Sequence, residues 1–310
     1  MRRTVLTLTC IMFTGCLPGE ELVCDSEDGT MRRAAGRDVL VRSPIDEELT
    51  PRGTVLLFHG LGESACTWVD RVEGRRLSDR FRDLGFTVLA PDSGPNTSAW
   101  RTGWPGNDDA AGIDATLRDL ADASVLDLDL PALALGHSNG GTFAPIWAEE
   151  SSTVSVLAAV DANGWGSDAL GGAASPPPVL FISARNDVIV PQSLTRAAEQ
   201  KARDAGHEVE SLENEPQAVR WNRFARIPTV DEDSSRAFFD ALEAGDFLDS
   251  DGTLRANPRL DRRWVDVVPD ELSEHVDALE EQLHVLFAEH RFSSDNREAI
   301  VSFFDAALED

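Results

Sequence analysis

The chain has 310 residues, 42% of them hydrophobic, and carries 55 acidic against 28 basic residues, a formal net charge of −27. So negative a surface repels phosphate backbones and argues against nucleic acid as a partner. The apolar fraction argues against a disordered chain, and the length suits one large domain. Its apolar runs are far shorter than the ~20 residues that a membrane-spanning helix needs.

The first residues have the pattern of an export signal. Arg2 and Arg3 precede an apolar run over residues 5–13, followed by Thr14-Gly15-Cys16. Residues 1–15 are therefore predicted to be a signal peptide. A Cys directly after small residues resembles a bacterial lipobox, which predicts a lipoprotein of the cell envelope that touches the membrane only through lipid on Cys16. The alternative is an ordinary signal peptide cut nearby, which predicts a periplasmic or secreted protein.

Two further cysteines follow the predicted signal. In an oxidising compartment Cys24 and Cys66 could form a disulfide, and the alternative is two unpaired buried thiols. No cysteine spacing is typical of a zinc site. The run from Asp249 to Gly252 lacks the alternating ligands of a calcium loop and is predicted to be a turn. We expect neither a metal nor a cofactor.

The remaining chain alternates short β-branched runs with longer amphipathic segments. Residues 16–36 show no periodicity and are expected to form a tether ahead of one domain, residues 37–310. The predicted strands are 39–42, 54–58, 86–90, 132–135, 154–160, 179–182 and 208–212. The predicted helices are 68–84, 110–123, 140–149, 192–205, 235–244, 271–281 and 296–308. This alternation favours βαβ units and a parallel sheet, an α/β fold.

Two connections depart from a minimal α/β unit. Residues 161–178 are short and rich in Gly and Pro, so they cannot hold a helical cap. Residues 213–283 form a long excursion, which we predict to be a lid; the alternative is an addition on the outer face of the sheet. A lid would bring its apolar side chains to the carboxyl-terminal rim of the sheet: Trp221, Phe224, Phe238, Phe239 and Trp264.

The run Gly136-His137-Ser138-Asn139-Gly140 fits the pattern G-x-S-x-G and lies between an apolar strand and a predicted helix. A Ser at such a sharp turn adopts a strained backbone that lifts its Oγ above the edge of the sheet. Small residues two positions before and after it let neighbouring backbone pass. Ser138 is the predicted nucleophile, and a purely structural Gly-flanked turn is the alternative.

A second motif, His59-Gly60-Leu61-Gly62, directly follows the predicted strand 54–58. Acyl transfer needs backbone N–H donors aimed at the tetrahedral oxyanion, each worth about 3 kcal/mol of barrier. The N–H groups of Leu61 and Asn139 are the predicted oxyanion hole. His59 is expected to hold the turn through hydrogen bonds and not to transfer protons.

With these two motifs the chain resembles the α/β-hydrolase family over about residues 50–310, and looks most like bacterial esterases and dienelactone-hydrolase-like or peptidase-like relatives. The resemblance implies a mostly parallel, doubly wound sheet, here with a long insertion before the last strand and helix. It also implies the order nucleophile, acid, base. The acid falls on Asp187, in a stretch that follows a strand, and Asp161 is the reserve candidate.

Four histidines follow the proposed acid. The resemblance places the base in the loop before the last helix, which selects His290. His207 opens a strand too early, His275 is expected to be exposed in a charged helix, and His284 lies in LHVLF, expected to be a strand. A neutral imidazole base makes activity fall as pH drops through about 6 to 7.

These residues predict a serine hydrolase that acts on carboxylic esters through an acyl-enzyme. Its partner would be a small-molecule ester or amide. A serine peptidase with the same triad and a non-catalytic surface protein stay open, because a fold does not fix a substrate. Four tryptophans near strand ends could line a pocket or simply pack loops: Trp68, Trp100, Trp104 and Trp165.

Overall fold

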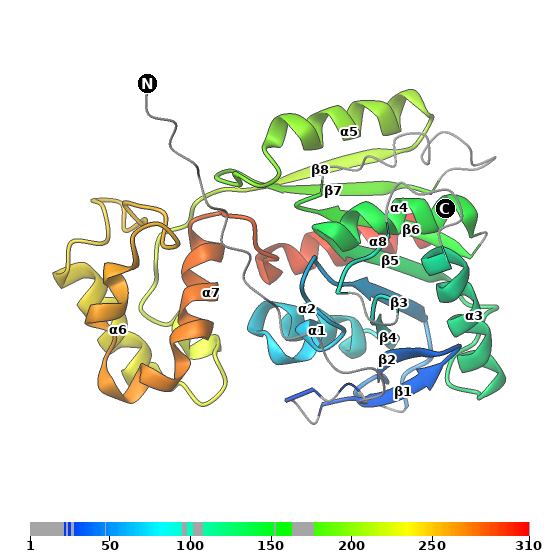
Figure 1. The fold of residues 1–310 in the computed structure, drawn as a ribbon, viewed down its shortest axis with the longest axis horizontal. Helices are drawn as coiled ribbons and strands as arrows, with labels where there is room; N and C mark the ends of the chain where they lie inside the picture. The colour runs from blue at the N-terminus through cyan, green and yellow to red at the C-terminus, as the bar shows by residue number, and fades with distance from the viewer. Residues whose placement is uncertain are drawn as a thin grey trace, which may run out of the picture.

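The computed structural model describes residues 22, 24–25, 28–46, 48–94, 98–101, 108–151, 153–162 and 177–309. Within these residues eight strands form one sheet in the order β1-β2-β4-β3-β5-β6-β7-β8 (Figure 1). The strands are β1 Thr30–Ala34, β2 Arg37–Arg42, β3 Gly53–Phe58, β4 Phe86–Pro91, β5 Ala132–His137, β6 Val154–Val160, β7 Val179–Ala184 and β8 Val209–Asn214.

Helices connect the strands and cover both faces of the sheet. They are α1 Thr67–Asp70, α2 Val72–Asp83, α3 Asp108–Asp122, α4 Asn139–Glu150, α5 Gln192–Asp204, α6 Glu232–Ala244, α7 Val276–Leu286 and α8 Arg297–Glu309. Short 3₁₀ turns are η2 Phe224–Arg226, η3 Arg262–Val267, η4 Asp270–His275 and η5 Ser294–Asn296. None of the described helices combines the length and apolar character needed to cross a bilayer.

The pleat of the sheet explains its two cores. Strands β3 to β8 pair in parallel, whereas β2 pairs antiparallel with both β4 and β1. Successive side chains point to opposite faces, so Leu56 packs with α3, α4 and α5 while Leu57 packs with α1, α2 and α8. A strand apolar on both faces must be covered on both. The prediction of an α/β-hydrolase-type, mostly parallel sheet is confirmed.

Two predicted boundaries are wrong. Strand β1 lies inside residues 16–36, predicted to be a tether, and pairs with β2. The LHVLF run, predicted as the last strand, is the end of helix α7. Leu279, Leu283 and Leu286 are all buried at helical spacing, which continues the preceding pattern; a short apolar run cannot by itself distinguish strand from helix. The long insertion therefore follows the last strand instead of preceding it.

The predicted insertion, residues 213–283, begins with the end of β8, and its remainder forms a lobe beside the sheet domain (Figure 1). Phe224, Phe238 and Trp264 are buried in a third apolar cluster built almost wholly from the insertion and α7. These side chains were predicted to reach the rim of the sheet, and they instead fill the core of the lobe. A segment this long must bury its own apolar groups before it can cover anything else.

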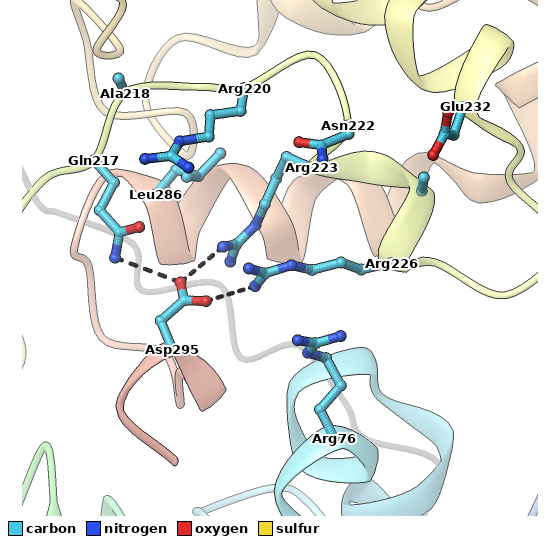
Figure 2. A pocket seen from close by; sticks show the side chains of 11 residues that line it. Arg76, Gln217, Ala218, Arg220, Asn222, Arg223, Arg226, Glu232, Leu286 and Asp295 are labelled. Carbon is cyan, nitrogen blue, oxygen red and sulfur yellow. Dashed lines mark hydrogen bonds and ion pairs between the residues drawn. The ribbon is translucent and has the colours of Figure 1, made fainter. Parts of the chain in front are cut away.

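A buried ionic network docks the lobe on the sheet domain. The Glu73 carboxylate on α2 accepts hydrogen bonds from Gln282 Nε2 (2.9 Å) and Arg223 Nη2 (3.4 Å) of the lobe. It also accepts from the backbone N–H (2.8 Å) and Oγ (2.6 Å) of Ser294. Arg223 in turn donates to Asp295 at 2.7 Å (Figure 2). Helix α2, the lobe and the loop before α8 are thereby held together.

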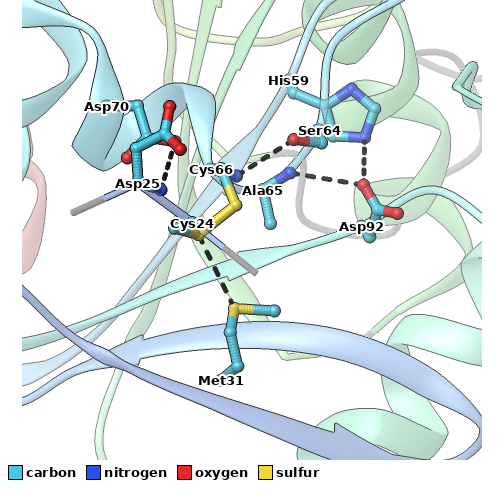
Figure 3. The surroundings of a disulfide bond; sticks show 9 residues. All are labelled: Cys24, Asp25, Met31, His59, Ser64, Ala65, Cys66, Asp70 and Asp92. Carbon is cyan, nitrogen blue, oxygen red and sulfur yellow. Dashed lines mark hydrogen bonds and ion pairs between the residues drawn. A yellow bond between two sulfur atoms is a disulfide. The ribbon is translucent and has the colours of Figure 1, made fainter. Parts of the chain in front are cut away.

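Cys24 and Cys66 form a disulfide, which resolves the two alternatives left by the sequence (Figure 3). The bond ties the segment before β1 to the residue that precedes α1, across 42 positions of the chain. Closing a loop of this length stabilises a fold by about 2–4 kcal/mol, chiefly by restricting the unfolded chain. It also fixes the helix start just beyond the His59–Gly62 turn.

Candidate active site

Ser138 lies at a sharp turn between β5 and α4. Its backbone has φ 53° and ψ −115°, a conformation that non-glycine residues rarely adopt. A Cβ on Gly136 would come within 2.2 Å of the Gly140 oxygen, and one on Gly140 within 2.3 Å of the Phe58 oxygen. Both flanking positions therefore require glycine. This is the strained strand-to-helix turn predicted from G-x-S-x-G.

The structure brings Ser138, His290 and Asp187 together from three separate loops. His290 Nε2 lies 2.8 Å from Ser138 Oγ, and its Nδ1 lies 2.6 Å from Asp187 Oδ2. The other Asp187 oxygen accepts the backbone N–H groups of Ile189 and Val190 at 2.7 and 2.8 Å. The carboxylate is thus fixed on one side, leaving the other to orient the imidazole. This geometry suits proton transfer from a serine to a histidine.

Asp161, the reserve acid, lies beside the triad without bonding to it. Its carboxylate and the ligand atoms of Asp187 and His290 all lie within 4.8 Å of one another. Neither Asp161 oxygen has a hydrogen-bond partner among the described residues. Burial, reinforced by the charge of Asp187, raises the pKa of Asp161 well above its ordinary value. The structure therefore joins Asp187, and not Asp161, to the imidazole.

Within the described residues, the His59–Gly62 turn leaves one backbone donor unpaired. The Gly60 N–H binds Glu63 Oε2 at 2.9 Å and the Gly62 N–H binds the Ser98 oxygen at 2.7 Å. Among the described residues no acceptor pairs with the Leu61 N–H between them, nor with the Asn139 N–H at the start of α4. Both donors predicted for the oxyanion hole are thus unengaged.

His59 holds this turn, as predicted. It is fully buried. Its Nε2 accepts the Ser93 N–H at 3.1 Å, so the proton is on Nδ1, which donates to the Gly60 oxygen at 2.8 Å. Both ring nitrogens therefore contact backbone, and Nε2 also lies 3.4 Å from Asp92 Oδ1 (Figure 3).

Trp68 and Trp100, the two of these tryptophans that the structure describes, are buried and pack against other aromatic rings. Trp100 is 2% exposed, stacks on Phe143 with ring centroids 4.6 Å apart, and exchanges two hydrogen bonds with the Asn139 side chain. Trp68 is equally buried, against Phe292. The Asn139–Trp100 pair ties the residue after the nucleophile to a neighbouring loop. Trp104 and Trp165 lie outside the described residues, as do most of residues 161–178 and all of 1–20.

The remaining downstream histidines have other surroundings, and His207 Nδ1 lies 2.8 Å from the Pro177 oxygen. His284 is 2% exposed inside α7, with no hydrogen bond on either ring nitrogen in the described structure. Burial lowers its pKa to about 4. His275 is the last residue of the 3₁₀ helix η4, directly before α7, and its Nε2 lies 3.3 Å from Thr229 Oγ1.

Glu63 is a site residue that the sequence did not reveal. It follows the His59–Gly62 turn and receives Arg71 Nη1 at 2.6 Å as well as the Gly60 N–H. Burial opposes ionisation, but His137, Arg71 and the Gly60 N–H together hold the pKa of Glu63 below its ordinary value. An ionised Glu63 therefore fixes the turn that presents the Leu61 N–H. Only the fold, which brings Arg71 back to it, reveals this role.

Glu281 on α7 gives the site region a testable pH response. Burial, reinforced by Glu73, raises its pKa to about 7 from an ordinary 4.5, against the opposing charge of Arg71. The folded state thus binds a proton that the unfolded state releases, and stability is lost as pH rises from about 4.5 through 7. We expect Glu281→Gln to be more stable than wild type by about 1–3 kcal/mol at pH 8. The gain should shrink toward zero at pH 5.

Urea unfolding at both pH values measures this difference. Glu271→Gln is the matched control, because that residue is exposed and forms no ion pair within the described part of the chain, so its neutralisation should change stability equally at either pH. A Glu281→Gln variant with the same advantage at pH 5 and pH 8 would contradict the assignment.

No family model matches the sequence, and no curated protein does. Among solved structures, Est1E from Butyrivibrio proteoclasticus is 12% identical, with a TM-score of 0.44 over 61% of this chain and 89% of that one. The Pyrococcus furiosus esterase Pf2001 is 15% identical, with a TM-score of 0.46 over 59% and 80%. A puromycin-hydrolyzing peptidase of Mycobacterium tuberculosis is 16% identical, with a TM-score of 0.46 over 60% and 36%. Similarities this low carry no argument about substrate, so the chemistry is inferred from the site itself.

Proposed function

We propose that the protein is a serine hydrolase that cleaves carboxylic esters through an acyl-enzyme. The observation that carries the proposal is the pair of hydrogen bonds that links Ser138 Oγ to His290 and His290 to Asp187, at 2.8 and 2.6 Å. Each group lies within the reach that proton transfer requires. The strained backbone of Ser138 aims its oxygen out of the sheet edge.

In the proposed reaction, Ser138 Oγ attacks the ester carbonyl while His290 Nε2 accepts its proton. The N–H groups of Leu61 and Asn139 bind the oxyanion of the tetrahedral intermediate. The C–O bond to the alcohol then breaks, and the imidazolium returns its proton to the leaving oxygen. Water repeats the sequence on the acyl-enzyme and releases the acid. Asp187 holds the tautomer and stabilises the imidazolium throughout.

The exposed apolar side chains favour an apolar acyl or alkyl group. Among the described residues, five such side chains adjoin the loops of the site: Leu61, Val188, Ile189, Leu194 and Leu260. Three others lie in loops at the opposite edge of the sheet: Ile45, Leu49 and Leu128. Exposed apolar side chains beside a catalytic site can contact the apolar part of a substrate.

The lobe brings Leu260 to this region. Asn257 Nδ2 and Arg259 Nε bind the carboxylate of Glu289 at 2.8 and 3.3 Å, and Glu289 immediately precedes His290. Leu260 itself is 84% exposed. We therefore propose that this part of the insertion borders the substrate. Only this part of the predicted lid would contact the substrate.

A fluorophosphonate probe tests the enzyme proposal. It should attach to Ser138 in the folded protein and not after unfolding, since only the assembled triad activates the hydroxyl. Mass spectrometry identifies the modified residue, and folded protein without an adduct on Ser138 would sink the proposal. A panel of p-nitrophenyl esters against aminoacyl p-nitroanilides then separates an esterase from a peptidase, the alternative with the same triad.

The ester panel also tests the apolar surface. We expect Val188→Ser and Leu260→Ser to lower kcat/KM for a p-nitrophenyl octanoate by about three- to tenfold, because each removes apolar contact with a long chain. The acetate ester should be nearly unaffected. Leu128→Ser, at the opposite edge, is the control and should leave both rates unchanged. Equal losses on acetate and octanoate would contradict an acyl-chain role.

We also propose that the protein is exported. The Cys24–Cys66 disulfide supports this, because such bonds form and persist in oxidising compartments. The choice between a lipid-anchored and a free form rests on Cys16. Detergent partitioning of wild type and of Cys16→Ser would decide it.

A further inference from the structure

A pocket of about 450 Å³ lies between the lobe and the sheet domain, and it has an unexpected charge. Its walls contain four arginines against two carboxylates, in a chain whose net charge is −27. The arginines are Arg76, Arg220, Arg223 and Arg226. Ser138, Asp187 and His290 do not line it. In Figure 2 the guanidinium groups of Arg76 and Arg226 gather around the cavity near Asp295.

Two of these arginines anchor the floor of the pocket. Arg223 is 5% exposed, and its N–H groups donate hydrogen bonds to Gln282, Asp295 and Glu73. Arg226 Nη1 binds the second Asp295 oxygen at 2.6 Å. Burial alone would raise the pKa of Asp295, but Arg223 and Arg226 lower it to about 2. Asp295 is thus a fixed anion whose two oxygens are already engaged.

Several other N–H groups of the pocket arginines have no anionic partner in the described part of the chain. In the described part of the chain, the Arg220 side chain makes no hydrogen bond or ion pair, and the Arg76 side chain makes one hydrogen bond, from Nε to Ser294 Oγ at 3.3 Å. Beyond Nη1, the N–H groups of Arg226 also have no described acceptor. Burial and the nearby charges of Arg226 and Arg297 lower the pKa of Arg76. Even with the buried Glu73 counted beside Asp295 and Glu232, the four arginines leave a positive charge at this pocket.

We propose that this pocket binds a small molecule through phosphate or carboxylate oxygens, held by Arg76, Arg220 and Arg226. Guanidinium forks match both kinds of oxyanion in two-point contacts. The volume exceeds that of one phosphate ion and lies in the range of small-molecule sites. Gln217 and Asn222 on the wall supply neutral donors and acceptors for the rest of the ligand.

Thermal unfolding in titrations of inorganic phosphate and of citrate tests the proposal, with ionic strength held constant by sodium chloride. The wild-type melting temperature should rise saturably with at least one anion, since binding only the folded state stabilises it. Phosphate alone, citrate alone, or both would identify the oxyanion. No saturable rise with either would overturn the proposal.

Variants locate the site. Arg220→Gln and Arg76→Gln should each weaken the apparent affinity by about tenfold or more, the effect of one charge-assisted hydrogen bond. Arg220 is exposed and unpaired, so its variant should fold normally. Arg196→Gln, whose side chain is 66% exposed on α5, is the control and should bind like wild type. Protein labelled at Ser138 should also bind like wild type. Equal binding by all arginine variants would place the anion elsewhere and refute the assignment.

Discussion

Replacing Ser138 by Ala should lower kcat by about 10⁵-fold or more, to the rate left by the oxyanion donors and binding alone. His290→Ala should lose nearly as much, because without the imidazole the Ser138 hydroxyl has no acceptor for its proton at 2.8 Å. The two losses should not add, since the residues act as a unit. Steady-state kinetics on an activated ester measures all three variants, singles and double.

The control for the base is His275→Ala. His275 lies in the lobe, against Thr229, so this variant should keep wild-type activity. Circular dichroism should show Ser138→Ala folded, since only one oxygen is removed. If Ser138→Ala turned over the ester at more than about a hundredth of the wild-type rate, the nucleophile would lie elsewhere. If His275→Ala instead of His290→Ala were inactive, the base would be misassigned.

Glu73→Ala should lower the free energy of unfolding by about 3–5 kcal/mol, the cost of breaking a buried ion pair on one side. The carboxylate is fully buried and accepts from Ser294, Gln282 and Arg223. Without the Glu73 carboxylate, the buried Arg223 loses one of its counterions. The Ser294 N–H, four residues after His290, loses its acceptor. We expect activity to fall as well. Urea unfolding measures the loss of stability. A fall in kcat/KM would report that His290 has moved from its position beside Ser138.

Glu298→Ala is the matched control for this second change. Glu298 is paired with Arg80 at 2.9 Å but is 56% exposed, so its loss should cost less than about 1 kcal/mol. The double variant Glu73→Leu with Arg223→Met should be less destabilised than the sum of the single variants, because both charges leave together. A cost below 1 kcal/mol for Glu73→Ala would show that the lobe is held by its apolar contacts alone.

The parts of the site that could be predicted from sequence are those made by neighbouring residues. The turn around Ser138 is encoded within five positions, because Gly136 and Gly140 are needed by backbone that passes within about 2 Å of where a Cβ would lie. The His59–Gly62 turn is equally local. Asp187 and His290 were predicted from the resemblance to the family. In the structure His290 lies within hydrogen-bonding distance of both Ser138 and Asp187.

The parts that could not be predicted depend on distant partners. Glu73 meets Arg223 across 150 positions and Ser294 across 221, and a carboxylate in an amphipathic helix gives no sign of either. The segment at His284 was misassigned for a different reason: a five-residue run with four apolar residues fits a strand or a buried helix end equally well. The apolar side chains of the insertion were expected to face the sheet because the sequence does not show that they suffice to form a separate core.

The insertion leaves and rejoins the sheet domain at almost the same point. The Gln217 N–H donates to the Leu286 oxygen at 2.8 Å, so the segments that enter and leave the lobe meet at this point. A unit with its own core and adjoining ends behaves as a cassette: it can be lengthened, exchanged or removed without re-threading the sheet. Evolution can therefore alter the surroundings of Leu260 while leaving Ser138, His290 and Asp187 in place. A protein engineer could do the same by grafting a different lobe between these two positions.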